Sequence, residues 1–361
     1  MKLNLTAKID FLSPFKNKTF LGVDIGTSSI KIVQLTRERD KYRLDTYGEV
    51  HLYEKDTQGK LEETSLKMLD NQVATLLRKI ITESGVKTKK TAMSVPVFSS
   101  FSTIIEMPDI PKGELDKAIE FQARQYIPVP VEQISLNSVV ISREKKSKNS
   151  PGKLEVLLVA VPNEVKRKYY NIAKLSGLDL VALEMETFPM ARAITKDKEK
   201  TFIIVDIGAK STNYCIVDGG FVRLSHNFDV SGVDITRAFA DYSGGDYLKG
   251  EKVKRSMGLK MTPGQMDMAP EVLSSVSSIA SEAERIMSAY FNKTTKRVES
   301  MVLSGGSANM LGLSDYFSEK LDIEVELADP FKKTIYPKEL KKILKEIGPS
   351  FTIAAGLAMR R

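Results

Sequence analysis

The chain has 361 residues, of which 42% are hydrophobic and 28% charged, and this globular mixture excludes wholesale disorder. A single cysteine, Cys215, and two histidines exclude a disulfide, a cysteine-rich metal cluster and a multi-histidine metal site. The formal net charge of +8 keeps nucleic acid and anionic membrane surfaces in consideration. The length predicts two or three domains, and the absence of a long apolar stretch or a secretory signal predicts a cytoplasmic protein.

The first half of the chain predicts a sheet followed by a smaller unit. Alternating apolar residues predict two strands joined by a tight turn within 19–35, a strand at 42–50, a helix at 64–84 and a strand ending at Pro96. The smaller unit that follows is expected to contain a strand, a helix, two strands and a helix, at 101–107, 114–127, 134–143, 153–161 and 163–177. The polar segment EKKSKNSPG predicts an exposed hairpin loop between its second and third strands.

The opening pattern returns in the second half of the chain. FLGVDIGTSSIKIVQL at 20–35 aligns with FIIVDIGAKSTNYCIV at 202–217, an offset of 182, with Phe, Val, Asp, Ile, Gly and Ser coinciding. Two distant copies indicate two similar domains rather than a solenoid. Helices are expected near 231–242, 246–257 and 265–293, and a strand at 298–303 leads into SGGSANM, which is expected to open another helix.

Each copy of the repeat places an Asp-x-Gly turn between two strands. The turn residues offer a glycine that lets the backbone approach a ligand, consecutive N–H groups and hydroxyls, a combination that binds phosphate oxygens. The aspartates Asp24 and Asp206 could hold Mg²⁺, which prefers one or two carboxylates together with substrate phosphates. Two such turns facing each other predict a clamp for a nucleoside triphosphate. Neither GxxxxGK[ST] nor GxGxxG occurs, so P-loop and Rossmann sites are disfavoured.

These motifs resemble the superfamily of actin, Hsp70 and sugar kinases. The doubled DxGxxS, the LSGGSAN turn and the AAGLA segment near the C-terminus carry this resemblance. It implies an α/β, actin-like ATPase fold in which two similar ribonuclease-H-like domains flank a nucleotide cleft. EMETFPMARA and TIAAGLA resemble the two connecting helices, and GEKVKRSMG resembles a helix whose Glu251 and Lys254 would line the nucleoside.

A closer resemblance runs from about residue 19 to 361. GVDIGTSSIKIVQL, ELDKAIEFQARQYIPVPVEQISLN, SGVDITRA and GPSFTIAAGLAMR together resemble the PilM family, cytoplasmic actin-like proteins of type IV pilus assembly. The resemblance implies ATP or ADP with Mg²⁺ as ligands and at most slow ATPase activity, with no catalytic residue assigned. It also implies a location at the cytoplasmic face of the inner membrane, reached through partners: the N-terminal peptide of PilN and other platform proteins.

The resemblance implies a division of the chain into five parts. These are an N-terminal tail (1–18), domain 1A (19–96, 181–199 and 341–361), a small inserted α+β domain 1C (97–180), domain 2A (200–234 and 298–340) and domain 2B (235–297). The PilN peptide would lie between domains 1A and 1C as an extended chain. The aromatics of this region, Phe98, Phe101, Phe121 and Tyr126, are expected to be mostly core residues.

The sequence and the resemblance together give one set of candidate site residues. The metal site is assigned to Asp24 and Asp206. The cofactor site is assigned to Asp24, Gly26, Thr27, Ser28, Ser29, Lys31, Asp206, Gly208, Ala209, Lys210, Ser211, Thr212, Gly232, Glu251, Lys254, Gly305, Gly306, Ser307 and Asn309.

Three other interpretations compete with a pilus adaptor. A small-molecule kinase of the same superfamily would need a catalytic base, and none is identifiable. An FtsA-like filament protein is disfavoured because a C-terminal amphipathic helix is missing after AMRR, although homo-oligomerisation stays open. A nucleic-acid binder is disfavoured because the lysines are spread over loops without interleaved aromatics. The lysine-rich stretch 332–345 is expected to be helical, with an apolar stripe that needs no partner.

Overall fold

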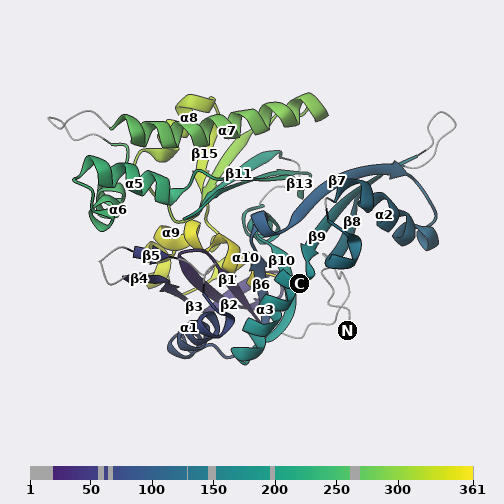
Figure 1. Cartoon of the computed structure of the whole chain (residues 1–361), viewed down its shortest axis with the longest axis horizontal. Coiled ribbons are helices and arrows are strands. Elements are labelled where there is room, and N and C mark those ends of the chain that lie inside the picture. The colour runs from purple at the N-terminus through teal and green to yellow at the C-terminus, as the bar shows by residue number, and fades with distance from the viewer. Residues whose placement is uncertain are drawn as a thin grey trace.

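The computed structural model describes residues 19–55, 61–63, 68–127, 129–144, 152–195, 200–260 and 269–360. The predicted tail at 1–18 and most of the predicted loop at 144–152 lie outside these ranges. The described part contains three larger sheets with helices packed on them, and a two-stranded ribbon of β4 (Tyr53–Lys55) and β5 (Leu61–Glu63) (Figure 1). None of the described helices has the length and apolar character needed to cross a bilayer.

A six-stranded sheet forms the first half of the fold. Its order is β10-β6-β1-β2-β3-β16, with β10, β6 and β1 parallel and with β2 antiparallel to both β1 and β3. The strands are β1 (Thr19–Ile25), β2 (Ser29–Glu38), β3 (Lys41–His51), β6 (Lys90–Val95), β10 (Asp179–Met185) and β16 (Thr334–Ile335).

A five-stranded sheet forms the second half and repeats this arrangement. Its order is β13-β12-β11-β14-β15, with β15, β14 and β11 parallel and with β12 antiparallel to both β11 and β13. The strands are β11 (Phe202–Ile207), β12 (Thr212–Asp218), β13 (Phe221–Phe228), β14 (Ser300–Ser304) and β15 (Glu324–Leu327). Five strands therefore match in order and direction, which confirms the predicted pair of similar units.

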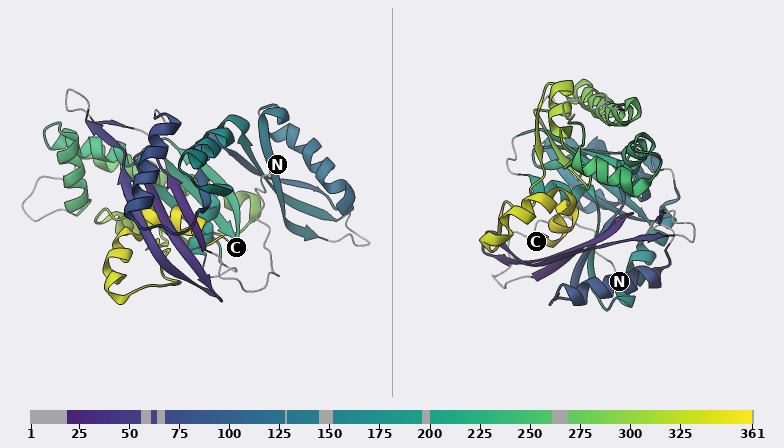
Figure 2. Two further views of the ribbon diagram at one scale, coloured as in Figure 1. Left: turned by 90° about the horizontal axis from the view of Figure 1, so that it is seen from below. Right: turned by 90° about the vertical axis from the view of Figure 1, so that its left-hand side faces the viewer.

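Helices occupy both faces of each sheet. Between the sheets lie α4 (Thr187–Ile194) and α10 (Thr352–Ala358), where Met190 and Leu357 pack with Cys215 in one buried cluster. The other face of the first sheet is covered by α1 (Asp70–Glu83) and α3 (Asn163–Leu175). The other face of the second is covered by α5 (Gly232–Tyr242), α7 (Pro270–Thr294) and α8 (Leu313–Leu321) (Figure 2). Strands covered on both faces explain fully buried runs such as FIIVDI in β11.

Two glycines let α10 approach its neighbours closely. A Cβ on Gly22 in β1 would lie 2.0 Å from the Ala354 carbonyl oxygen, and one on Gly356 in α10 would lie 1.9 Å from the Pro189 carbonyl oxygen. Any other residue would push the helix away from β1 and α4. The glycines thus hold α10 against β1, the strand that ends at the first Asp-x-Gly turn.

A three-stranded sheet with one helix forms the predicted inserted unit. Its order is β7-β9-β8, from β7 (Phe101–Pro108), β8 (Ile134–Glu144) and β9 (Lys153–Pro162), and α2 (Lys112–Tyr126) packs on one face. The expectation that its aromatics are mostly core residues is wrong. Phe98, Phe121 and Tyr126 are 48%, 65% and 45% exposed, and only Phe101 packs against the buried cluster of this unit.

Three local expectations need correction. The helix expected from residue 64 begins at Asp70. The SGGSANM segment forms turns after β14, and the next helix, α8, begins only at Leu313. The lysine-rich stretch contains β16 before a short helical turn (Lys338–Leu340) and α9 (Lys341–Ile347), because Pro337 interrupts any continuous helix.

The remaining described helices are α6 (Tyr247–Ser256) and three short helical turns at Val97–Ser99, Val131–Gln133 and Gly348–Phe351. Most strands of the three larger sheets lie in the parts of the chain assigned above to domains 1A, 2A and 1C. Two strands of the first sheet cross the assigned boundaries: β10 begins at Asp179, in the range assigned to 1C, and β16 lies in the range assigned to 2A but pairs with β3. The domain boundaries themselves stay a prediction.

Candidate functional site

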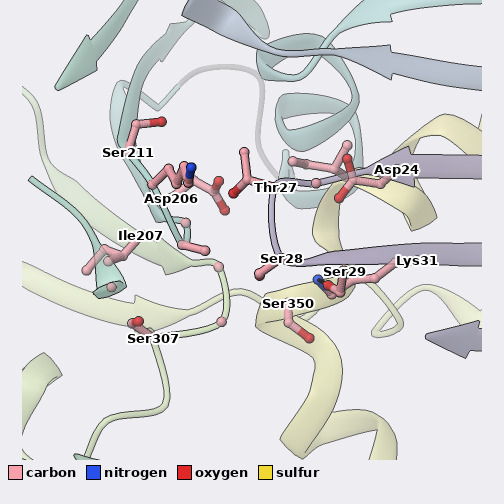
Figure 3. A pocket seen from close by; sticks show the side chains of 18 of the residues that line it. Asp24, Thr27, Ser28, Ser29, Lys31, Asp206, Ile207, Ser211, Ser307 and Ser350 are labelled. Carbon is pink, nitrogen blue, oxygen red and sulfur yellow. Dashed lines mark hydrogen bonds between the residues drawn. The ribbon is translucent and has the colours of Figure 1, made fainter. Parts of the chain in front are cut away.

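The two Asp-x-Gly turns face each other across a cleft between the halves of the molecule. The first turn joins β1 to β2, and the second joins β11 to β12. Figure 3 shows Asp24 and Asp206 on opposite sides of the pocket, with Thr27 between them. The cavity has a volume of about 500 Å³. The repeat in the sequence therefore brings two acid–glycine turns to one place.

All but one of the predicted site residues line this cavity. They come from both turns, from the start of α5, from α6 and from the turn after β14. The lining includes Asp24, Gly26, Thr27, Ser28, Ser29, Lys31, Asp206, Gly208, Ala209, Lys210, Ser211, Gly232, Glu251, Lys254, Gly305, Gly306, Ser307 and Asn309. Thr212 does not line it: the side chain is fully buried in β12, and its hydroxyl donates a hydrogen bond to the Val230 carbonyl oxygen at 2.7 Å.

The second turn is tied to the N-terminus of α5 by backbone hydrogen bonds. The Gly208 N–H donates to the Ser211 carbonyl oxygen at 3.0 Å, which closes the turn. The Gly232 N–H then donates to the Gly208 carbonyl oxygen at 2.8 Å. A helix N-terminus beside a tight turn concentrates backbone N–H dipoles, and such a place favours anions.

Strand β2, which follows the first turn, carries a lysine held by polar neighbours. The Lys31 ammonium donates to the Ser29 hydroxyl at 2.6 Å and lies 3.2 Å from the Glu49 carboxylate. Burial raises the pKa of Glu49, but Lys31 and hydrogen bonds outweigh this, so the net pKa is lowered. The Lys31 ammonium is thus fixed at the cleft, beside Asp24.

A buried lysine connects α5, α6 and the turn after β14. The Lys254 ammonium lies 2.8 Å from the Glu251 carboxylate and donates to the Thr236 hydroxyl at 2.8 Å. It also reaches the Gly232 carbonyl oxygen at 3.3 Å and the Ser307 hydroxyl at 3.4 Å. Burial lowers the pKa of Lys254, and Glu251 opposes that shift. Lys254 and Glu251 therefore line the cleft and also link α5, α6 and the turn after β14.

Of the two glycines in the turn after β14, only Gly305 occupies a position that no other residue fits without strain. Gly305 has a φ of +91°, and a Cβ there would lie 2.4 Å from the Ile207 carbonyl oxygen. Its N–H donates to the Pro349 carbonyl oxygen at 2.9 Å. A Cβ on Gly306 would meet nothing within 4 Å. Gly305 therefore lets the turn lie against the end of β11, next to the second Asp-x-Gly turn.

Sequence reasoning missed three acidic residues that line the cleft, Glu49, Glu186 and Glu346. Glu186 immediately precedes α4. Its carboxylate accepts hydrogen bonds from the Asn213 amide at 3.1 Å and from the Val97 N–H at 3.3 Å. The residue belongs to the EMETFPMARA segment, which marked a connecting helix but gave no sign of which side chain faces the cleft. Only the pairing of β10 with β6 brings Glu186 to the cleft.

Three buried carboxyl groups oppose one another's ionisation. Burial, reinforced by Asp24 and Asp206, raises the pKa of Glu186 well above its ordinary value. Burial also raises the pKa of Asp206 to about 6. The nearby Asp24 adds to this rise, whereas a hydrogen bond from Ser304 opposes it. The pKa of Asp24 is raised by burial too, although Lys31 and a hydrogen bond from Ser94 lower it. Negative charge here is therefore unfavourable without a cation.

The donor set suits Mg²⁺ held together with phosphates. Within the described residues, no group of three or more His, Cys, Asp or Glu side chains is placed to hold a metal ion by itself. Mg²⁺ characteristically binds through one or two carboxylates, water and substrate phosphate oxygens. Asp24 and Asp206 fit that description, and a divalent cation would relieve their mutual repulsion.

The two equivalent sheets and the cleft with its paired acid–glycine turns define an actin-like ATPase fold, as the sequence predicted. The profile of the family described as "Type IV pilus assembly protein PilM" matches residues 22–361. The chain therefore belongs to the PilM family of type IV pilus assembly proteins, which confirms the predicted family and role in pilus assembly.

Comparison with solved structures supports the fold. The structure titled "PilM-PilN type IV pilus biogenesis complex" is 22% identical, with a TM-score of 0.78, covering 96% of this chain and 99% of that chain. The ethanolamine utilization protein EutJ from Carboxydothermus hydrogenoformans is 15% identical (TM-score 0.53, 97% of this chain and 92% of that one). MreB 5 of Spiroplasma citri bound to AMPPNP is 11% identical (TM-score 0.50, 95% of each chain).

Proposed function

We propose that this pilus assembly protein binds ATP or ADP with Mg²⁺ in the cleft. The observation that carries the proposal is the opposition of two Asp-x-Gly turns, whose acids, Asp24 and Asp206, lie on either side of the cavity. The hydroxyls and N–H groups after Gly26 and Gly208 would hold phosphate oxygens, and Glu251 and Lys254 would lie along the nucleoside. The similar MreB 5 structure contains AMPPNP, a nucleotide analogue, which is consistent with this assignment.

Bound Mg²⁺ would neutralise phosphate charge and hold the carboxylates ionised. The protein's own residues would orient the ligand: the Lys31 ammonium is fixed by Ser29 and Glu49, and the second turn is fixed by α5. Hydrolysis is expected to be slow. This expectation follows the resemblance to the PilM family, and no side chain of the cleft is assigned as a catalytic base.

Calorimetric titration with MgATP tests nucleotide binding. Asp24→Ala should weaken Mg²⁺-dependent ATP binding at least tenfold, because it removes one of two carboxylates near the metal. Asp229→Ala is the matched control, since Asp229 is an exposed acid after β13. Unchanged affinity in Asp24→Ala, or equal losses in both variants, would argue against the proposed metal site.

We further propose that the chain binds the N-terminal cytoplasmic peptide of PilN between domains 1A and 1C. This would place it, with other platform proteins, at the cytoplasmic face of the inner membrane. The proposal is supported by the similar PilM–PilN complex and by Phe98, which is 48% exposed and lies in the helical turn between β6 and β7. An exposed aromatic between two sheets suits capture of an extended peptide.

Fluorescence anisotropy with a labelled PilN peptide tests this second part. Binding of micromolar affinity or weaker is expected, because an ordered short peptide loses about 1–2 kcal/mol of backbone entropy per residue. Phe98→Ser should weaken binding about tenfold or more. Phe291→Ser, at a similarly exposed aromatic on α7, should leave it unchanged. No binding by the folded, nucleotide-loaded protein would contradict the proposal and favour an FtsA-like filament.

A further inference from the structure

Six lysines between β15 and α10 are exposed. One of them, Lys333, donates a hydrogen bond to the Thr195 carbonyl oxygen at 2.7 Å, and the other five are considered together. They belong to the segment that contains β16, the helical turn at 338–340 and α9. Within the described ranges, none of the ion pairs involves any of them. We call this surface the basic edge, and its lysines are Lys332, Lys338, Lys341, Lys342 and Lys345.

The lysines of the basic edge differ from surface arginines that are held in ion pairs. Arg43, opposite Ile335 in the β3–β16 pair, is bonded to Glu38 and Asp45. On α7, Arg285 is similarly bonded to Glu282. The segment also carries two exposed acids, Glu339 and Glu346, so the basic edge presents a net positive charge, and its lysines take part in none of the ion pairs of the described residues. Such a surface attracts a polyanion.

Two isoleucines of the same segment have large exposed fractions. Ile335 in β16 and Ile343 in α9 are each 44% exposed. Leu344 is buried and Leu340 packs against the same cluster, so the helix already has an inner apolar side. The predicted apolar stripe of this segment is therefore packed against the fold at the two leucines and exposed at the two isoleucines.

We propose that the basic edge docks on the surface of an anionic lipid bilayer. A segment that carries both exposed lysines and exposed aliphatic side chains matches the requirements of an interfacial site, in which charge attracts acidic headgroups and apolar groups enter the headgroup–acyl boundary. A nucleic acid backbone would use the lysines but not Ile335 and Ile343. An acidic polypeptide is the competing occupant, and the experiment below separates it from the bilayer.

The position of the basic edge makes this contact compatible with the other proposed sites. In Figures 1 and 2, α9 lies away from α2 and the three-stranded sheet of the inserted unit. Glu346 and Ile347 of α9 line the cleft, whereas Lys342 and Lys345 are exposed to solvent. A bilayer at the basic edge would therefore leave the inserted unit accessible.

Co-sedimentation of the full chain with vesicles tests the proposal. The protein should bind phosphatidylcholine vesicles that contain phosphatidylglycerol, should not bind phosphatidylcholine alone, and should dissociate at high salt. The triple variant Lys338→Glu, Lys341→Glu, Lys345→Glu should bind at least about 100-fold more weakly at low salt. The double variant Ile335→Ser, Ile343→Ser should bind several-fold more weakly and keep the salt dependence of the wild type, because its lysines are unchanged.

A matched control separates the basic edge from total charge. Lys89→Glu, Lys174→Glu, Lys293→Glu changes three exposed lysines from separate parts of the chain, and either triple variant reduces the net charge from +8 to +2. Equal loss of binding in both triple variants, or no binding by the wild type, would overturn the proposal. So would a wild type that ignores the vesicles but binds polyglutamate through the basic edge, because the occupant would then be an acidic polypeptide. Circular dichroism and melting curves would establish that each variant folds.

Discussion

Replacing Asp206 with asparagine should stabilise the ligand-free protein at neutral pH. The carboxyl group has a pKa of about 6 in the fold against an ordinary value of 3.8. The folded protein therefore binds more protons than the unfolded chain between these values, and stability falls as the pH rises through them. At about 1.4 kcal/mol per pH unit, the ionised group costs about 3 kcal/mol near pH 7.5. Asparagine removes that cost and keeps an oxygen that can accept the hydrogen bond from Ser304.

The assay is urea denaturation of wild type and Asp206→Asn without nucleotide or metal. The variant should be more stable by about 3 kcal/mol near pH 7.5, and by about half as much near pH 5. MgATP should stabilise the wild type but stabilise the variant much less, because one metal ligand is gone. Asp229→Asn, at an exposed acid, should change little. A variant that is less stable than the wild type near pH 7.5, or an advantage that grows as the pH falls, would refute this reasoning.

Three further predictions concern the frame around the cleft. Gly305→Ala should destabilise the fold by about 2 kcal/mol or more, because of its positive φ and the nearby Ile207 carbonyl, whereas Gly306→Ala should melt like the wild type. Arg223 in β13 forms an ion pair with Glu155 in β9 at 2.8 Å, which links the second sheet to the inserted unit. A double-mutant cycle with Arg223→Met and Glu155→Gln should give about 1 kcal/mol of coupling free energy. No coupling would mean that this ion pair does not hold the inserted unit against the second sheet. Burial raises the pKa of the Cys215 thiol, so alkylation should follow unfolding, and rapid labelling of the folded protein would contradict this burial.

The sequence was most informative where a pattern occurs twice. The alignment of 20–35 with 202–217 predicted two equivalent hairpins, and the structure contains them as β1–β2 and β11–β12. The same pattern explains the error at Thr212. In a strand, neighbouring side chains alternate between faces, so extending the turn by one residue moved the assignment from the cleft into the core.

Tertiary arrangement accounts for the features that the sequence did not reveal. Glu186 faces the cleft only because β10 pairs with β6, and a single acid before a helix gives no local sign of that. The exposure of Phe121 and Tyr126 depends on which side of α2 meets the three-stranded sheet. Helical periodicity places an apolar stripe but does not show whether a bulky residue at its margin is covered.

A crystal structure of the protein with Mg²⁺ and a non-hydrolysable ATP analogue tests the central claim most directly. The account predicts the triphosphate between the turns that follow Asp24 and Asp206, with the cation between these two carboxylates and the phosphates. The nucleoside should lie against the wall formed by Glu251, Lys254 and the Gly305 turn. A nucleotide bound elsewhere, or an empty cleft at saturating concentrations, would contradict it.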